Sequence, residues 1–131
     1  MRMFTEKRIL VAEDIEINRE ILQKMLEGTG LSIDFARNGI DALIMFEDNP
    51  KKYDLFITDI SMPEINGYET TRKMRAMGGW GQKIPIIAMT ANVSRDDIDK
   101  CFAAGMNDHL GKPVEVQELL KKLQKHLYPV S

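Results

Sequence analysis

The sequence predicts an α/β protein built on a doubly wound, five-stranded parallel sheet. Short apolar runs alternate with longer segments of helical spacing along the chain, and no internal repeat or low-complexity tract interrupts this alternation. The strongest runs are unbroken, as is typical of parallel strands covered by helices on both faces. The element order is therefore βαβαβαβαβα, and right-handed crossovers place helices on both faces of the sheet. In the doubly wound strand order 2-1-3-4-5, the first and third strands are neighbours.

Five segments have the character of strands. Residues 9–12 and 55–58 form unbroken apolar runs and should lie at the centre of the sheet, and residues 85–89 resemble them with a proline at the strand entrance. Residues 32–36 alternate polar and apolar side chains, which indicates a half-exposed edge strand. Residues 108–110 would form a short fifth strand.

The segments between the strands carry apolar stripes at helical spacing. Gly28 and Gly30 should end the first helix, and Ser94 followed by Asp97 resembles a capping box at the start of the fourth. We expect the buried stripes to be Ile21, Leu22, Met25 and Leu26 in the first helix, Ile40, Leu43 and Ile44 in the second, and Val116, Leu119, Leu120, Leu123 and Leu127 in the last.

The remaining helical side chains are assigned by the same periodicity. Lys121, Lys122 and Lys125 should lie on the solvent side of the last helix, with His126 as a solvated cation that complements the helix dipole. Cys101 lies beside Phe102 on an apolar stripe and should belong to the core. Gly78 to Gly81 indicate a flexible loop before the fourth strand, and one alternative is that Trp80 is exposed there and contacts a partner.

Composition limits the class of protein. A chain of 131 residues suits a single domain, which we place at residues 1–131 with its core at about residues 8–127. With a net charge of -2, the chain has no excess of positive charge that would attract nucleic acid or an anionic membrane. The single cysteine excludes an intramolecular disulfide, and no apolar run approaches the roughly 20 residues of a membrane span. We therefore expect a cytoplasmic location.

Carboxylates follow two strands that would be neighbours in the predicted sheet. Glu13 and Asp14 follow the first strand, and Asp59 follows the third. Three such charges in a partly desolvated site imply either raised pKa values or a hard cation, and we favour Mg²⁺. Thr90 and Lys112 follow the fourth and fifth strands and would supply a hydroxyl and a positive charge. Phosphoryl transfer to one aspartate needs this combination of groups.

At this point the chain resembles the receiver domains of two-component response regulators and hybrid sensor kinases, from about Arg8 to Leu127. The resemblance implies a (βα)5 flavodoxin-like fold with the strand order 2-1-3-4-5. The matching motifs are Val11-Ala12-Glu13-Asp14, Thr58-Asp59-Ile60-Ser61-Met62-Pro63-Glu64-Ile65-Asn66-Gly67, Met89-Thr90-Ala91-Asn92 and Gly111-Lys112-Pro113.

The resemblance implies that Asp59 accepts a phosphoryl group from a phosphohistidine on a partner protein. Glu13, Asp14, Asp59 and the backbone carbonyl of Ser61 would hold Mg²⁺, with Mn²⁺ as a substitute ion. Lys112 would pair with the phosphoryl group. The domain would catalyse its own phosphorylation and dephosphorylation and would otherwise not be an enzyme in isolation.

The resemblance also implies a conformational switch. Thr90 would turn inward to bind the phosphoryl group, and the peptide bond between Lys112 and Pro113 would be cis. The family pairs the threonine with an aromatic residue three positions before the lysine, where this chain has His109. His109 is therefore either a switch element or a packed strand residue. Ile15 also departs from the asparagine that is frequent in relatives.

Residues 13–20 and 89–92 resemble the receivers of hybrid sensor kinases, and a free-standing receiver is the alternative. The implied partners are a histidine kinase or histidine phosphotransfer domain and an output protein. The output protein would contact the face formed by the fourth helix, fifth strand and fifth helix. We expect no contact with nucleic acid or membrane by this domain, even where it forms the cytoplasmic part of a membrane-bound sensor kinase.

Two other functions are compatible with the same fold. A small phosphohydrolase would use Asp59 as nucleophile, but such enzymes often carry an aspartate acid/base two positions later, where this chain has Ser61. A flavodoxin-like nucleotide module would need a phosphate cradle after the first strand. Glu13 and Asp14 would repel a phosphate there.

Overall fold

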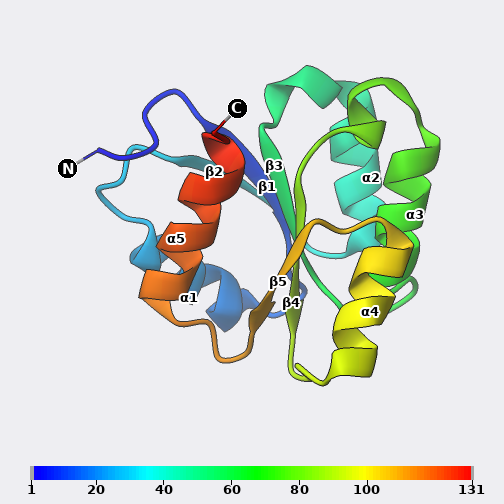
Figure 1. Ribbon diagram of the computed structural model, residues 1–131. Coiled ribbons are helices and arrows are strands. Elements are labelled where there is room, and N and C mark those ends of the chain that lie inside the picture. Colours follow the sequence, from blue (N-terminus) through cyan, green and yellow to red (C-terminus); the bar gives the residue numbers. More distant parts are fainter. Residues whose placement is uncertain (1, 131) are drawn as a thin grey trace.

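The computed structural model describes residues 2–130, so Met1 and Ser131, the ends of the expected domain, lie outside the described residues. Its sheet has five parallel strands in the order β2-β1-β3-β4-β5, as predicted. The strands are β1 (Arg8–Ala12), β2 (Ser32–Ala36), β3 (Leu55–Asp59), β4 (Ile86–Thr90) and β5 (Asp108–Gly111). Their carboxyl ends all lie at the lower edge of the sheet in Figure 1.

Helices cover both faces of the sheet. They are α1 (Glu16–Met25), α2 (Gly39–Asp48), α3 (Gly67–Ala76), α4 (Arg95–Ala104) and α5 (Val116–Leu127), with short 3-10 helices at Pro50–Lys52 and Gly79–Gln82. Helices α1 and α5 lie on one face, and α2, α3 and α4 lie on the other (Figure 1). Among residues 2–130, no helix combines the length and the apolar character needed to cross a membrane.

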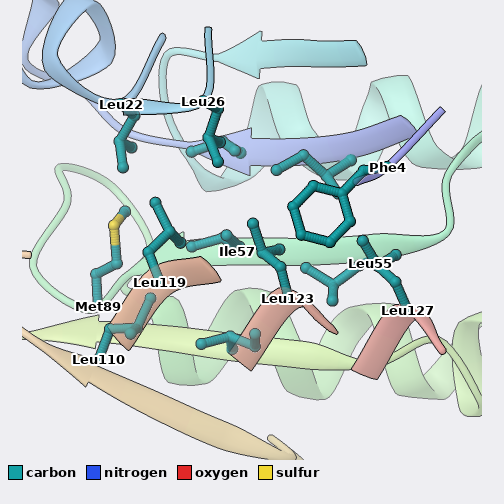
Figure 2. Packing of buried hydrophobic residues seen from close by; sticks show 13 residues of the cluster. Phe4, Leu22, Leu26, Leu55, Ile57, Met89, Leu110, Leu119, Leu123 and Leu127 are labelled. Carbon is teal, nitrogen blue, oxygen red and sulfur yellow. The ribbon is translucent and has the colours of Figure 1, made fainter. Parts of the chain in front are cut away.

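Each face of the sheet has its own core. On the α1 and α5 side, leucines of both helices pack against Leu55 and Ile57 of β3, with Phe4 closing one end (Figure 2). On the other side, Phe46 of α2 and Met74 of α3 pack against the opposite face of the strands. Each such side chain stabilises the fold by roughly 1.5–3 kcal/mol when fully buried. The strands are therefore held rigidly, and so are the residues at their ends.

The predicted stripe of α2 is wrong for two residues. Ile44 is 61% exposed and Ile40 is also exposed, whereas Ala42 and Phe46 are buried. The reason is the close approach of α3, because a Cβ on Gly39 would lie 2.1 Å from Oγ1 of Thr70. The face that contains Gly39 therefore turns inward. In α1, Leu22 and Leu26 are buried as expected but Ile21 is exposed.

The solvent side predicted for α5 is also wrong in part. His126 Nε2 lies 2.8 Å from Asp108 Oδ2, and Lys122 Nζ lies 3.2 Å from Asp108 Oδ1. Lys122 also donates a hydrogen bond to the carbonyl of His109. Both side chains are mostly buried because Asp108, the first residue of β5, faces α5 and attracts them.

Three other expectations concern α4 and the segment before β4. Ser94 is the N-cap of α4, as predicted, and Cys101 is buried. Phe102, however, is 51% exposed, because it lies beside the inward stripe of Cys101 rather than on it. The predicted flexible loop is a 3-10 helix, in which Trp80 Nε1 donates a 2.8 Å hydrogen bond to the carbonyl of Tyr53.

Candidate functional site

The strand order brings the predicted site residues together at one edge of the sheet. Glu13 and Asp14 follow β1, and Asp59 is the last residue of its neighbour β3. Thr90 ends β4 and pairs in register with Gly111 of β5, which directly precedes Lys112. Because parallel strands end at the same edge, residues far apart in the sequence converge there.

The start of α3 packs directly against the backbone of Asp59 and Ile60. The amide of Gly67 donates a 2.9 Å hydrogen bond to the carbonyl of Ile60, and a Cβ at Gly67 would lie 2.5 Å from the carbonyl oxygen of Asp59. Only glycine permits this approach. Asn66 caps the helix in a reciprocal capping box with Glu69, which fixes where α3 begins.

The Lys112 ammonium is the positive charge of the site. Its Nζ lies 2.7 Å from Asp59 Oδ2 and 3.6 Å from Glu13 Oε1. Both carboxylates are buried, with Glu13 1% and Asp59 3% exposed. The peptide bond between Lys112 and Pro113 is cis, as the resemblance implied. One ammonium against three carboxylates leaves the site negatively charged.

The three carboxylates suit a divalent cation. Glu13, Asp14 and Asp59 each offer a carboxylate oxygen, and these oxygens lie within 4.8 Å of one another. Oδ1 of Asp14 is buried and has no hydrogen-bond partner among the described residues. A buried carboxylate oxygen without a partner is costly, and a bound cation would satisfy it. This oxygen-rich donor set is the kind that Mg²⁺ and Ca²⁺ prefer.

The electrostatics of Glu13 agree with a site that needs a cation. Burial raises the pKa of the Glu13 carboxyl above its usual value, although its hydrogen bond from the Ile15 amide, at 3.1 Å, acts in the opposite direction. The negative charge of Asp59 raises the pKa of Glu13 further, and the Lys112 ammonium lowers it. Two close carboxylates therefore repel each other in a dry environment.

Ser61 lies on the solvent side of the carboxylates. Its amide donates a 3.3 Å hydrogen bond to Oδ1 of Asp59. Ser61 and Asp14 also line one shallow depression beside Met62, Pro63 and Asn66. The serine is therefore next to the metal-ligating candidates, as its expected role requires.

Thr90 faces a cavity of about 210 Å³ above Asp59. The Thr90 hydroxyl donates to the carbonyl of Asn92 at 3.0 Å and accepts from the Asn92 amide at 3.1 Å, so it is held within its own loop. The walls of the cavity are Asp59, Ile60, Ser61, Tyr68, Thr90, Ala91, Asn92, Asp97, Lys100 and Lys112.

His109 does not line this cavity. Its Nδ1 is buried without a hydrogen-bond partner among the described residues, and its side chain is only partly exposed. The role of His109 as a switch element therefore stays a prediction. Sequence analysis missed Tyr68, Asp97 and Lys100 as cavity residues. Tyr68 adjoins the motif that ends at Gly67, but no pattern in the sequence indicates that α4 faces the site.

Comparison with known proteins gives a consistent result. The family model described as "Response regulator receiver domain" matches residues 9–124. The hybrid signal transduction protein dokA of Dictyostelium discoideum is 42% identical over 118 residues, which cover 90% of this chain. The chain spans only 7% of that protein and 7–17% of other curated relatives that it matches.

Solved structures show the same architecture. The receiver domain of the sensor histidine kinase PA1611 from Pseudomonas aeruginosa, described with a magnesium ion in its active-site cleft, is 36% identical with a TM-score of 0.83, and the match covers 92% of this chain and 97% of that one. A second match is the Saccharomyces cerevisiae complex of the histidine phosphotransfer protein Ypd1 with the receiver domain of Ssk1. The matched chain is 28% identical with a TM-score of 0.83, and the match covers 94% of this chain and 90% of that one.

Proposed function

We propose that this chain, which belongs to the response regulator receiver domain family, accepts a phosphoryl group on Asp59 and thereby acts as a signalling switch. The observation that carries the proposal is the arrangement around one buried aspartate. Lys112 binds one of its oxygens at 2.7 Å, two further carboxylates lie beside it, and a cavity with a threonine hydroxyl lies above it. Phosphoryl transfer depends mainly on such positioning and charge neutralisation.

The chemistry assigns a role to each group. A carboxylate oxygen of Asp59 attacks the phosphorus of a phosphohistidine, the bond between phosphorus and imidazole nitrogen breaks, and the imidazole leaves with its electron pair and takes up a proton. Lys112 stays close enough to Asp59 to pair with a phosphoryl oxygen. The Thr90 hydroxyl leaves Asn92 and donates to the phosphoryl group instead.

Magnesium is the cation that we propose for the carboxylate cluster. Glu13, Asp14, Asp59 and the carbonyl of Ser61 are its proposed ligands, directly or through water. Bound there, Mg²⁺ would neutralise the carboxylates and the developing charge on the phosphoryl oxygens. The partnerless Oδ1 of Asp14 supports this assignment, as does the magnesium described in the related receiver of PA1611.

The proposed phosphodonor is a histidine kinase or a histidine phosphotransfer domain, and the chain is proposed to be the receiver of a hybrid histidine kinase. The 42% identity to the hybrid signal transduction protein dokA supports the hybrid context, and the complex of Ypd1 with a related receiver supports a histidine phosphotransfer partner. Phosphorylation would shift a two-state equilibrium of the surface formed by α4, β5 and α5, where an output protein would bind. A cytoplasmic location follows from the same proposal.

One experiment tests the central step. Wild type and Asp59→Asn are incubated with acetyl phosphate, with and without Mg²⁺, quenched in acid and measured as intact masses. We expect the mass of one phosphoryl group on the wild type with Mg²⁺ and on no other sample. Equal uptake by Asp59→Asn would disprove the role of Asp59, and no uptake by a wild type that binds Mg²⁺ would contradict the proposed switch.

A further inference from the structure

Helix α4 presents two opposite charges to the cavity above Asp59. Asp97 in its first turn and Lys100 one turn later both line this cavity, together with Thr90 and Lys112. The two side chains belong to one short helix and lie on the side that faces the phosphorylation site. A new charge in the cavity would therefore act on α4 directly, without an intermediate residue.

The Asp97 carboxylate is also part of the cap of α4. Ser94 Oγ donates a hydrogen bond to Oδ2 of Asp97 and accepts one from the Asp97 amide at 3.3 Å. The carbonyl of Ser94 accepts the first regular helical hydrogen bond, from Ile98 at 3.0 Å. The first turn of α4 thus depends on the position of the Asp97 side chain.

The negative charge of Asp97 affects two groups on the inner side of α4, Tyr68 and Cys101. Burial raises the pKa of the Tyr68 hydroxyl and of the Cys101 thiol, and the negative charge of Asp97 contributes to both increases. Tyr68 lines the same cavity, and Cys101 is buried between α4 and the sheet. The carboxylate is therefore close to the space where a phosphoryl group would be placed.

We propose that Asp97 is a positioning residue through which a phosphoryl group on Asp59 loosens the first turn of α4. The inference rests on the proposed function, because it needs Asp59 to be phosphorylated. Phosphorylation replaces the single charge of the Asp59 carboxylate with an acyl phosphate that carries close to two negative charges, so the cavity gains about one negative charge. This added charge repels the Asp97 carboxylate away from Ser94 and attracts the Lys100 ammonium. Opposite forces on two successive turns rotate α4 and weaken its N-terminal cap.

Amide hydrogen exchange of peptides that cover residues 93–102 measures this effect. Wild type is compared before and after phosphorylation by acetyl phosphate and Mg²⁺, with the phosphorylated fraction determined by intact mass. We expect exchange of residues 96–99 to rise about fivefold on phosphorylation, the size of effect that a screened repulsion across one small cavity produces. Asp97→Asn retains the cap geometry without the charge. In this variant, the exchange rate of residues 96–99 should rise less than twofold on phosphorylation.

Asp96→Asn is the matched control, because Asp96 lies in the same turn and is exposed but does not line the cavity. Each variant is compared at the same phosphorylated fraction, and Asp96→Asn should respond like wild type. In Ser94→Ala, the amides of residues 96–99 should exchange faster than in wild type before phosphorylation, and phosphorylation should raise their exchange rate little further. An equal rise in Asp97→Asn and wild type would overturn the role of Asp97. Absence of phosphorylation in the wild type would instead overturn the proposed function.

Discussion

The Lys112 ammonium lies 2.7 Å from Oδ2 of Asp59. This ion pair leaves Glu13 Oε1 3.6 Å from the same nitrogen, so one lysine balances two buried carboxylates. A divalent cation and Lys112 therefore compensate the same negative charges. Removing the lysine should have opposite effects on metal binding and on phosphoryl transfer.

Lys112→Met should bind Mg²⁺ more tightly than wild type, because a competing positive charge is lost. The same variant should take up phosphate from acetyl phosphate about 100-fold more slowly, since a group that neutralises the transferring phosphoryl is absent. Titration calorimetry and timed intact-mass measurements test both effects. Lys83→Met, at an exposed lysine, is the control and should change neither. Weaker Mg²⁺ binding by Lys112→Met would contradict this account of the charges.

Asp14 has a buried carboxylate oxygen that no described residue satisfies. Asp14→Asn should lower the affinity for Mg²⁺ by about tenfold or more, because an amide is a poorer ligand for a hard cation than a carboxylate. Titration calorimetry at neutral pH measures the change. Asp96→Asn removes the same formal charge at an exposed position away from the site and should keep the affinity within twofold. Unchanged affinity of Asp14→Asn would remove this residue from the metal site.

Asp108 predicts a dependence of stability on pH. Burial disfavours its charged form, but the hydrogen bonds from His126 and the His109 amide and the charge of Lys122 hold the pKa of this carboxyl below 3.8. A lowered pKa in the folded state means that the stabilisation is present above 3.8 and is lost as pH falls through the folded value. Asp108→Asn should lower the free energy of unfolding by about 1–3 kcal/mol at pH 7.

Urea unfolding of wild type and Asp108→Asn at pH 7 and pH 3 tests this sign. The difference between the two proteins should shrink at pH 3, because this pH lies below the ordinary pKa of 3.8 and part of the stabilisation is lost there. Asp41→Asn, in the first turn of α2, shows how much a single aspartate in a helix contributes without such partners. A difference that stays constant between the two pH values would mean that the charge of Asp108 contributes nothing.

Arg75 connects α3 to the segments that flank β4 and β5. Its guanidinium donates hydrogen bonds to the carbonyls of Gly81, Ile84 and Gly105 and to the Asn107 side chain, at 2.7–3.0 Å. Burial lowers the pKa of this guanidinium, and it stays a donor throughout the neutral range. Arg75→Lys should cost about 2 kcal/mol, because an ammonium cannot satisfy this divergent set of acceptors.

Chemical unfolding measures this cost, with Arg72→Lys at an exposed position of the same helix as control. Phosphoryl uptake by Arg75→Lys should remain, since Arg75 lies outside the cavity above Asp59. A stability equal to that of Arg72→Lys would show that the four acceptors do not depend on the guanidinium.

The apolar runs were enough to predict the five strands and a parallel sheet with helices on both faces, because unbroken runs are typical of covered parallel strands. The strand order 2-1-3-4-5 followed from the resemblance to receiver domains. The same reasoning predicted which residues follow the strands, and the structure brings Glu13, Asp14, Asp59, Thr90 and Lys112 to one edge. These predictions succeeded because they depend on local patterns and on the common direction of parallel strands.

Helical periodicity predicted the buried leucines of α1 and α5, but tertiary structure decided which way several other helical side chains face. The spacing of Ile40 and Ile44 indicates a buried stripe, yet the close contact of Gly39 with α3 turns them outward. Lys122 and His126 lie at polar positions of α5, and only Asp108 on β5 draws them inward. Asp97 lines the cavity above Asp59, and the sequence pattern of α4 did not predict this position. These exceptions depend on contacts between residues that are distant in the chain, which helical periodicity does not describe.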